Sequence, residues 1–217
     1  MAGGTGTRMN AGIPKQFLIL AGKPLIIHCM LTFIKAYPDI TLVLALPSSH
    51  VETWQSLCNK YAFDIPHVIV PGGETRFHSV QHALSGLPAE GLVAIHDGAR
   101  PLVSETLIRS AFQTAEAFGN CIPVIPLSES VRMLSGESSH PVDRTLFRTV
   151  QTPQVFHTAN IKNAYKQPFR NGFTDDATVA ENMGETIHLI DGDPINLKIT
   201  HPYDLAMAEY LFERAHS

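Results

Sequence analysis

The stretch Gly3-Gly4-Thr5-Gly6-Thr7-Arg8-Met9, followed at once by Pro14-Lys15-Gln16-Phe17, is the most informative part of this 217-residue chain. Closely spaced glycines let a backbone turn tightly and bring its N–H groups close to a large anion. Arg8 adds a planar guanidinium that matches phosphate oxygens, and Lys15 adds a compact, mobile ammonium. The stretch therefore predicts a loop that binds a polyphosphate.

The two familiar glycine-rich phosphate loops do not fit this spacing. A Walker loop closes with Gly-Lys-Ser/Thr, whereas Lys15 follows Gly6 by nine residues and precedes Gln16. A dinucleotide fingerprint would need a third glycine where Met9 stands. A surface turn that is merely rich in glycine is a fair alternative for the glycines alone, but the neighbouring cations argue against it.

Composition limits the classes of function. A net charge of −4 argues against a general nucleic-acid binder. The sequence shows neither a signal peptide nor an apolar run long enough to span a membrane. The three cysteines lack a C-x-x-C spacing, so we expect buried free thiols and a cytoplasmic location. The eleven histidines form no metal-binding pair of the HExxH type.

Short apolar runs alternate with amphipathic stretches along the chain. The expected strands are 40–46, 67–70, 92–95, 121–125 and 186–190, and the expected helices are 25–37, 51–61, 75–87, 105–118, 158–165, 176–183 and 202–215. This alternation predicts a single α/β domain over residues 1–217, with a mostly parallel open sheet covered by helices on both faces, as in Rossmann-like folds.

Residues 127–150 interrupt this alternation. They contain short β-like segments around the turn Ser135-Gly136-Glu137, which predicts a β-arm that projects from the sheet. Because an exposed hairpin edge tends to be covered by another chain, we expect a two-fold homodimer that is joined through the arm. A solvent-facing hairpin on a monomer is the alternative.

The start of the chain is unusual for such a fold. A phosphate loop at the carboxyl end of a first strand needs that strand, yet Gly3 is the third residue. We expect either a strand of several residues upstream of Met1 or a numbering that begins after it.

Polar clusters follow the expected strands, where open α/β sheets place their ligand sites. Gly72 and Gly73 can approach a base edge closely, and Ser79 can hydrogen-bond to it, although Gly-Gly before a helix is also a common turn. Asp97 follows the strand 92–95 and suits a hard divalent cation, with Arg100 placed to hold a phosphate. A helix-capping Asp with an Arg partner is the weaker alternative.

Two further segments contain candidate residues. Thr174-Asp175-Asp176 opens a helix; one acid serves as an N-cap, and a polyol or metal contact would explain the other. Lys198 lies in a short apolar segment and needs an anionic partner. Arg144 and Ser130 lie in the arm and would reach a partner's site if the arm crosses to it.

The motifs occur in the order G-G-x-G-x-R-M…P-K-Q, G-G-x-x-R-x-x-S, H-D-x-A-R-P, V-D-R, T-P-Q, T-D-D and N-x-K-x-T, over nearly the whole chain. In this order the sequence resembles the methylerythritol phosphate cytidylyltransferases, CTP-dependent enzymes of the non-mevalonate isoprenoid pathway. The resemblance implies a nucleotidyltransferase domain with a dimerisation arm and a Mg²⁺ cofactor.

The resemblance also implies a role for each matching residue. Arg8 and Lys15 would stabilise charge on the triphosphate, and Lys198 would contact the α-phosphate. Asp97 would bind Mg²⁺. The cytosine-reading positions would be Ala2, Gly3, Gly72, Gly73 and Ser79, with Arg76 beside them. The contacts to the polyol phosphate would be Arg100, Thr174 and, from the neighbouring arm, Arg144 and Ser130. The family commonly has Asp-Thr where this chain has Glu129-Ser130, so the role of Ser130 is weakened.

The expected reaction is in-line attack by methylerythritol phosphate on the α-phosphorus of CTP, with release of pyrophosphate. A cytidylyltransferase acting on ribitol phosphate is the nearest alternative, and a UTP- or GTP-dependent sugar phosphate enzyme is a weaker one. A non-catalytic nucleotide-sensing protein is the alternative from another class.

Overall fold

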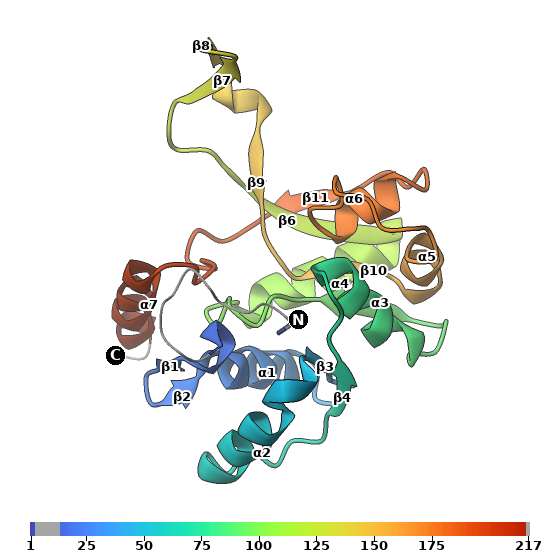
Figure 1. Cartoon of the computed structure of the whole chain (residues 1–217), viewed down its shortest axis with the longest axis vertical. Coiled ribbons are helices and arrows are strands. Elements are labelled where there is room, and N and C mark those ends of the chain that lie inside the picture. Colours follow the sequence, from blue (N-terminus) through green and yellow to red (C-terminus); the bar gives the residue numbers. More distant parts are fainter. Residues whose placement is uncertain (3–13, 216–217) are drawn as a thin grey trace.

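A computed structural model describes residues 1–2 and 14–215 of the chain. Its centre is a β-sheet flanked by helices, which confirms the predicted α/β class (Figure 1). The predictions for Gly3 and Arg8 fall outside the described residues.

Two groups of strands form the sheet layer. β3 (Val43–Leu46) runs parallel to β4 (Val68–Pro71). The second group has the spatial order β11 (Leu189–Asp191), β6 (Asn120–Pro126), β10 (Gln154–His157) and β5 (Leu92–Ile95), with β9 (Arg148–Val150) pairing with β6.

The sequence did not predict β10, which is antiparallel to both of its neighbours. Since β5 and β6 are each antiparallel to β10, they run in the same direction as one another, and β11 is parallel to β6. The strands of this group other than β10 and β9 therefore keep the expected common direction. β10 is short, and its ends, Gln154 and His157, are polar, so an apolar run does not reveal it.

The helices match their predicted positions to within a few residues at each end. They are α1 (Leu25–Ala36), α2 (Val51–Lys60), α3 (Arg76–Ser85), α4 (Glu105–Phe118), α5 (Thr158–Ala164), α6 (Asp176–Glu181) and α7 (Pro202–Ala215). α4 shows why such bounds are predictable: the Ser104 hydroxyl accepts a hydrogen bond from Leu107 N, and Gly119, at φ +95°, ends the helix. Among the described residues, none of the helices has the length and apolar character that a membrane span requires.

Residues 127–150 contain a hairpin of β7 (Val131–Ser135) and β8 (Ser138–Val142), followed by the 3₁₀ helix η4 (Arg144–Leu146). Figure 1 shows β7 and β8 at one end of the molecule, away from the helices. Smaller elements are the hairpin β1 (Ile19–Leu20) and β2 (Lys23–Pro24) and the 3₁₀ helices η2 (Lys15–Phe17) and η3 (Ser48–His50).

Apolar side chains from both faces of the sheet form the core. One cluster includes Phe77, Val80 and Phe156; another includes Phe17, Leu46 and Trp54. The three cysteines are free thiols, as predicted: Cys29 and Cys121 are buried, and Cys58 is half-buried. Because β3, β4 and β5 are fixed in this core, the segments that follow their carboxyl ends are held in place to form a site.

Candidate active site

A cleft of about 300 Å³ lies where the segments after β4 and β5 meet η2 and the segment before α7. It brings together six of the predicted site residues, from segments far apart in sequence. They are Ala2, Lys15, Arg76, Ser79, Asp97 and Lys198, and Met1, Gln16, Glu74, Thr75 and Ala99 complete the lining.

Asp97 is the anionic centre of the cleft. Its Oδ2 lies 2.7 Å from Lys198 Nζ and 3.7 Å from Arg100 Nε, and its Oδ1 lies 3.8 Å from Arg76 Nε. Burial alone would raise the pKa of Asp97, but Lys198, Arg76 and Arg100 together hold it well below the usual range of a carboxyl group. The carboxylate is therefore ionised at neutral pH.

The backbone of Asp97 is fixed by a hydrogen bond to Thr152, which also contacts His96. Its N–H donates to Thr152 Oγ1 over 3.1 Å, and that hydroxyl lies 3.1 Å from His96 Nδ1. Burial lowers the pKa of His96 to about 3, so its imidazole is neutral at physiological pH. A neutral polar network thus fixes the backbone of Asp97, while the carboxylate itself interacts with the surrounding cations.

Arg76 is held by a partner that the sequence did not reveal. Its two terminal nitrogens donate to the carboxylate of Asp176 at 2.8 and 2.5 Å, and Tyr165 Oη donates to the same carboxylate over 2.6 Å. Asp176 is completely buried. Desolvation would lower the pKa of Arg76, but the charge of Asp176 outweighs it and raises that pKa. A bidentate pair of this kind fixes a guanidinium in one orientation.

The predicted N-cap at the start of α6 is present, and it separates the two acids. Asp175 caps the helix and forms a capping box with Thr178, whereas Asp176 points inward to Arg76. No polyol or metal contact is needed to explain either acid. Thr174, just before them, is exposed.

The Gly72-Gly73 turn after β4 is packed too tightly for side chains. A Cβ at Gly73 would lie 2.4 Å from the Cβ of His78, and one at Gly72 would lie 3.3 Å from Pro47 N. Ser79 Oγ accepts from Gly73 N over 2.9 Å and donates its proton to Thr75 O over 3.0 Å. The hydroxyl therefore shapes the turn, and it has no second proton to donate to a base.

The segment that carries Lys198 is tied to the loop after β5. Ile199 N donates to Ala99 O over 2.8 Å, and Arg100 Nη1 donates to Asn196 O over 2.8 Å. Arg100 also donates to Val150 O, at the foot of the arm, over 3.4 Å. Arg100 is buried, and its hydrogen bond to Asn196 O helps to hold the segment that contains Lys198. The contact of Arg100 with a phosphate stays a prediction.

Lys15 begins η2 and is half-buried in the cleft wall. The next residue, Gln16, was quoted in the sequence motif without a role. It is buried, and its Nε2 donates to Ala2 O over 2.7 Å. This contact links the residue before the glycine-rich stretch to the residue beside Lys15.

As far as the described part of the chain defines the cleft, its lining includes none of the four predicted substrate residues, Arg100, Ser130, Arg144 and Thr174, and neither Gly72 nor Gly73. Ser130, Arg144 and Thr174 are exposed, and Arg144 donates to Ser128 O within the arm. The sequence did not reveal a role for Tyr165 or the contact of Asp176 with Arg76. The Arg76–Asp176 contact joins positions 100 residues apart, so local spacing carries no signal of it.

The geometry of Asp97 is compatible with a divalent cation. Mg²⁺ in proteins is commonly held by one or two carboxylates together with substrate phosphates. Within residues 1–2 and 14–215, His, Cys, Asp and Glu side chains do not gather in threes, so these side chains form no closed cage around a cation. The Asp97 carboxylate therefore fits a cation whose other ligands are substrate phosphates.

Comparisons with known proteins identify the family of the chain. The family model described as 2-C-methyl-D-erythritol 4-phosphate cytidylyltransferase matches residues 1–214. The proteins of that name from Bacteroides thetaiotaomicron (43% identical over 97% of this chain and 96% of the relative) and from Porphyromonas gingivalis strain ATCC 33277 (45% identical over 97% and 95%) are similar throughout.

A solved structure leads to the same family. The crystal structure of 2-C-methyl-D-erythritol 4-phosphate cytidylyltransferase from Thermus thermophilus superposes with a TM-score of 0.73 at 32% identity, over 92% of this chain and 94% of that one. With a family match over almost its whole length, the chain belongs to the 2-C-methyl-D-erythritol 4-phosphate cytidylyltransferase family.

Proposed function

We propose that this chain transfers CMP from CTP to 2-C-methyl-D-erythritol 4-phosphate and releases pyrophosphate. Family membership supports the reaction, and it does not favour ribitol phosphate as the acceptor. The observation that carries the proposal is the cleft itself, where the Asp97 carboxylate, the Lys198 ammonium and Lys15 meet at the ends of β-strands. This arrangement suits a polyanionic substrate.

The chemical step is a single displacement. An oxygen of the acceptor phosphate forms a bond to the α-phosphorus of CTP, and the bond from that phosphorus to the oxygen that bridges to the β-phosphate breaks. The electron pair leaves with pyrophosphate. A phosphate monoester is already anionic near pH 7, so no general base is required. Catalysis then comes from positioning and from charge stabilisation.

Lysine side chains supply much of that stabilisation. Lys198, whose Nζ is paired with Asp97 and whose side chain is 40% exposed, can turn its ammonium toward the α-phosphate. Lys15, in the wall of the same cleft, would stabilise charge on the departing pyrophosphate together with Arg8. When bound at Asp97, Mg²⁺ would supply further positive charge to the phosphates.

The remaining assignments concern the base and the acceptor. Cytosine would lie against the backbone of Ala2, Gly3 and the Gly72-Gly73 turn, with Ser79 and Arg76 holding that wall in shape. The acceptor would be bound by Arg100 and Thr174 together with Ser130 and Arg144 from a second copy of the chain. We place the protein in the cytoplasm as a homodimer.

Pyrophosphate release tests the reaction directly. With CTP and Mg²⁺, the protein should release pyrophosphate when methylerythritol phosphate is added, and far less with ribitol 5-phosphate. Replacing CTP with UTP or GTP should abolish most of the signal. Binding of CTP without turnover of any acceptor would instead identify a nucleotide-sensing protein.

Two substitutions test the lysine assignments. We expect Lys15→Ala and Lys198→Ala each to lower kcat by about 10²- to 10³-fold, the cost of losing one transition-state donor. Lys166→Ala removes an exposed lysine and serves as the matched control. If either variant keeps the kcat of the control, its lysine does not act on the transition state.

A further inference from the structure

Gln151 is a buried residue for which the sequence indicated no role. It follows β9 directly, and its side-chain amide is paired with the backbone of Asp193 in both directions. Its Nε2 donates to Asp193 O over 2.8 Å, and its Oε1 accepts from Asp193 N over 3.1 Å. Gly192 leaves room for this contact, since a Cβ there would lie 2.6 Å from Gln151 Oε1. The glutamine thus holds the segment after β11 as a neighbouring strand would.

The same amide contacts Asn196, which is completely buried. Asn196 Nδ2 donates to Gln151 Oε1 over 3.4 Å, and Gln151 Nε2 donates to Asn196 O over 3.4 Å. The backbone N–H of Asn196 donates to Asp193 O over 2.9 Å, so residues 193–196 form a turn. The glutamine therefore holds this turn at both ends. Lys198 lies two residues beyond it, so the turn sets the point from which the lysine side chain reaches into the cleft.

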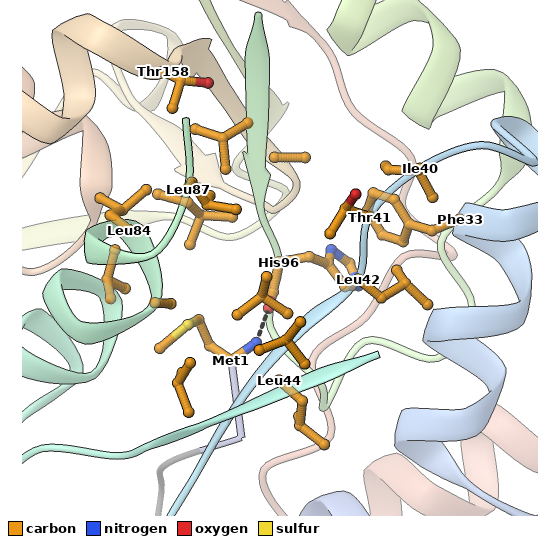
Figure 2. A pocket seen from close by; sticks show the side chains of 18 of the residues that line it. Met1, Phe33, Ile40, Thr41, Leu42, Leu44, Leu84, Leu87, His96 and Thr158 are labelled. Atoms are coloured by element: carbon orange, nitrogen blue, oxygen red, sulfur yellow. Dashed lines mark hydrogen bonds between the residues drawn. The ribbon is translucent and has the colours of Figure 1, made fainter. Parts of the chain in front are cut away.

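The anionic partner of that lysine, Asp97, is held by other residues. Its N–H donates to Thr152 Oγ1 over 3.1 Å. On either side of it, Met1 N donates to His96 O over 2.5 Å, and Met1 O accepts from Gly98 N over 2.9 Å. Figure 2 shows the bond between Met1 and His96 beside a mainly apolar cavity of about 520 Å³. The backbone around Asp97 is therefore fixed by contacts that the glutamine does not make.

Building on the proposed transfer of CMP, we propose that Gln151 is a positioning residue for Lys198. Its amide holds the turn at 193–196, and this turn sets where the lysine lies relative to the α-phosphate. Since Asp97 is fixed separately, the 2.7 Å contact between Lys198 Nζ and Asp97 Oδ2 depends on the turn. A displacement of about 1 Å at a reacting group can cost about 10²-fold in rate. Loss of the amide therefore lowers kcat through the lysine, although Gln151 is not among the described residues that line the cleft.

Asn120 provides a matched control, because its side chain makes the same kind of contact before β11. It is buried, its Nδ2 donates to Thr186 O over 2.9 Å, and its Oδ1 accepts from His188 N over 2.9 Å. Asn120 begins β6, which runs in the same direction as β5. Because the cleft follows the carboxyl end of β5, this contact lies at the opposite edge of the sheet.

The test compares Gln151→Met with Asn120→Leu, each of which replaces a buried amide by an apolar group of similar size. We expect Gln151→Met to lower kcat about 10- to 100-fold while the KM for CTP changes less than about threefold. Asn120→Leu should leave both constants near those of the wild type. Hydrogen exchange at the Ile199 amide should be about tenfold faster or more in Gln151→Met alone, and at the His188 amide in Asn120→Leu alone. Exchange at the Asp97 amide should change in neither variant.

A double-mutant cycle shows whether the glutamine acts through the lysine. When Gln151→Met is added to Lys198→Ala, kcat should fall by less than about threefold further, because the group that it positions is already gone. An equal loss of kcat with and without Lys198 would overturn the proposal, and so would an unchanged exchange rate at Ile199.

Pyrophosphate release by the wild type reports on the reaction itself, so failure of the proposed function is distinguished from failure of this positioning role. If Gln151→Met does not fold, Gln151→Asn enters the same cycle. It keeps an amide and removes one methylene, at a cost of about 1 kcal/mol, but the shorter side chain cannot reach the turn at both ends. A loss of kcat that depends on Lys198 supports the proposal, and a loss that does not contradicts it.

Discussion

Asp176 is the side chain on which the position of Arg76 depends. It is completely buried, and Arg76 and Tyr165 both donate to it. We expect Asp176→Asn to lower the free energy of unfolding by about 3 kcal/mol, because it removes the bidentate counter-charge of a half-buried guanidinium and leaves only the longer contact with Asp97. Urea unfolding measures this loss.

An exposed acid of the same helix provides the matched control. Glu181→Gln removes a surface carboxylate from the end of α6 and should change the free energy of unfolding by about a few tenths of a kcal/mol at most. Equal losses in the two variants would show that the loss at Asp176 does not come from its contact with Arg76.

Asp97 makes stability depend on pH. Its pKa in the folded protein lies below its unfolded value of about 3.9, because Lys198, Arg76 and Arg100 surround the carboxylate. Its contribution to stability is therefore fully present above that unfolded value and is lost as pH falls through the folded pKa. We expect the difference in unfolding free energy between wild type and Asp97→Asn to shrink steadily below about pH 4.

Urea titrations at pH 7, 5, 4 and 3 measure this difference. If the difference in unfolding free energy between wild type and Asp97→Asn stays constant down to pH 3, the ion pairs at Asp97 do not stabilise the folded state.

The turn between β4 and α3 depends on the absence of a side chain at Gly73. A Cβ there would lie 2.4 Å from the Cβ of His78, so the backbone would have to move. We expect Gly73→Ala to lower stability by about 1–3 kcal/mol and to weaken CTP binding about tenfold or more, because the turn forms a wall of the proposed base site. Calorimetry with CTP and Mg²⁺ measures the binding.

Gly86→Ala is the control, because a Cβ at Gly86 meets nothing within 4 Å and its φ of −83° suits any residue. If Gly73→Ala binds CTP as tightly as Gly86→Ala does, the turn is not part of the base site.

The sequence predicted those elements whose signals are local. α4 and α7 have their predicted bounds, and β5 was predicted residue for residue, because caps and apolar runs mark them. β10 was missed because it consists of four residues with polar ends, and only its two neighbours make it a strand. Its antiparallel direction is likewise a property of the assembled sheet.

The same distinction applies to the site. The motifs predicted that Lys15, Asp97 and Lys198 share a cleft, and they do. The ion pair of Arg76 with Asp176 depends on how distant segments pack, and the hydrogen bond from Gly73 N to Ser79 Oγ depends on the exact shape of the turn. Both could therefore be found only in the folded chain.

The arm carries apolar surface that one copy of the chain does not cover. Leu134 and Leu146 are each 80% exposed, and Met133 and Phe147 beside them are exposed as well. Apolar surface of this kind marks an interface between proteins. We expect a homodimer by light scattering at micromolar concentration, and a monomer when Leu134→Glu and Leu146→Glu are combined. Met183→Glu, at an exposed apolar residue outside the arm, should remain a dimer.

If the arms cross, each active site needs both copies of the chain. Arg144→Ala would then disable the partner's site, and Lys198→Ala would disable its own. Equal amounts of the two variants, unfolded and refolded together, form mixed dimers as half of the population, and each mixed dimer has one intact site. About one quarter of the wild-type activity should therefore return. Activity that stays at the level of the separate variants would place Arg144 in the same site as Lys198 of its own chain, or outside the site altogether.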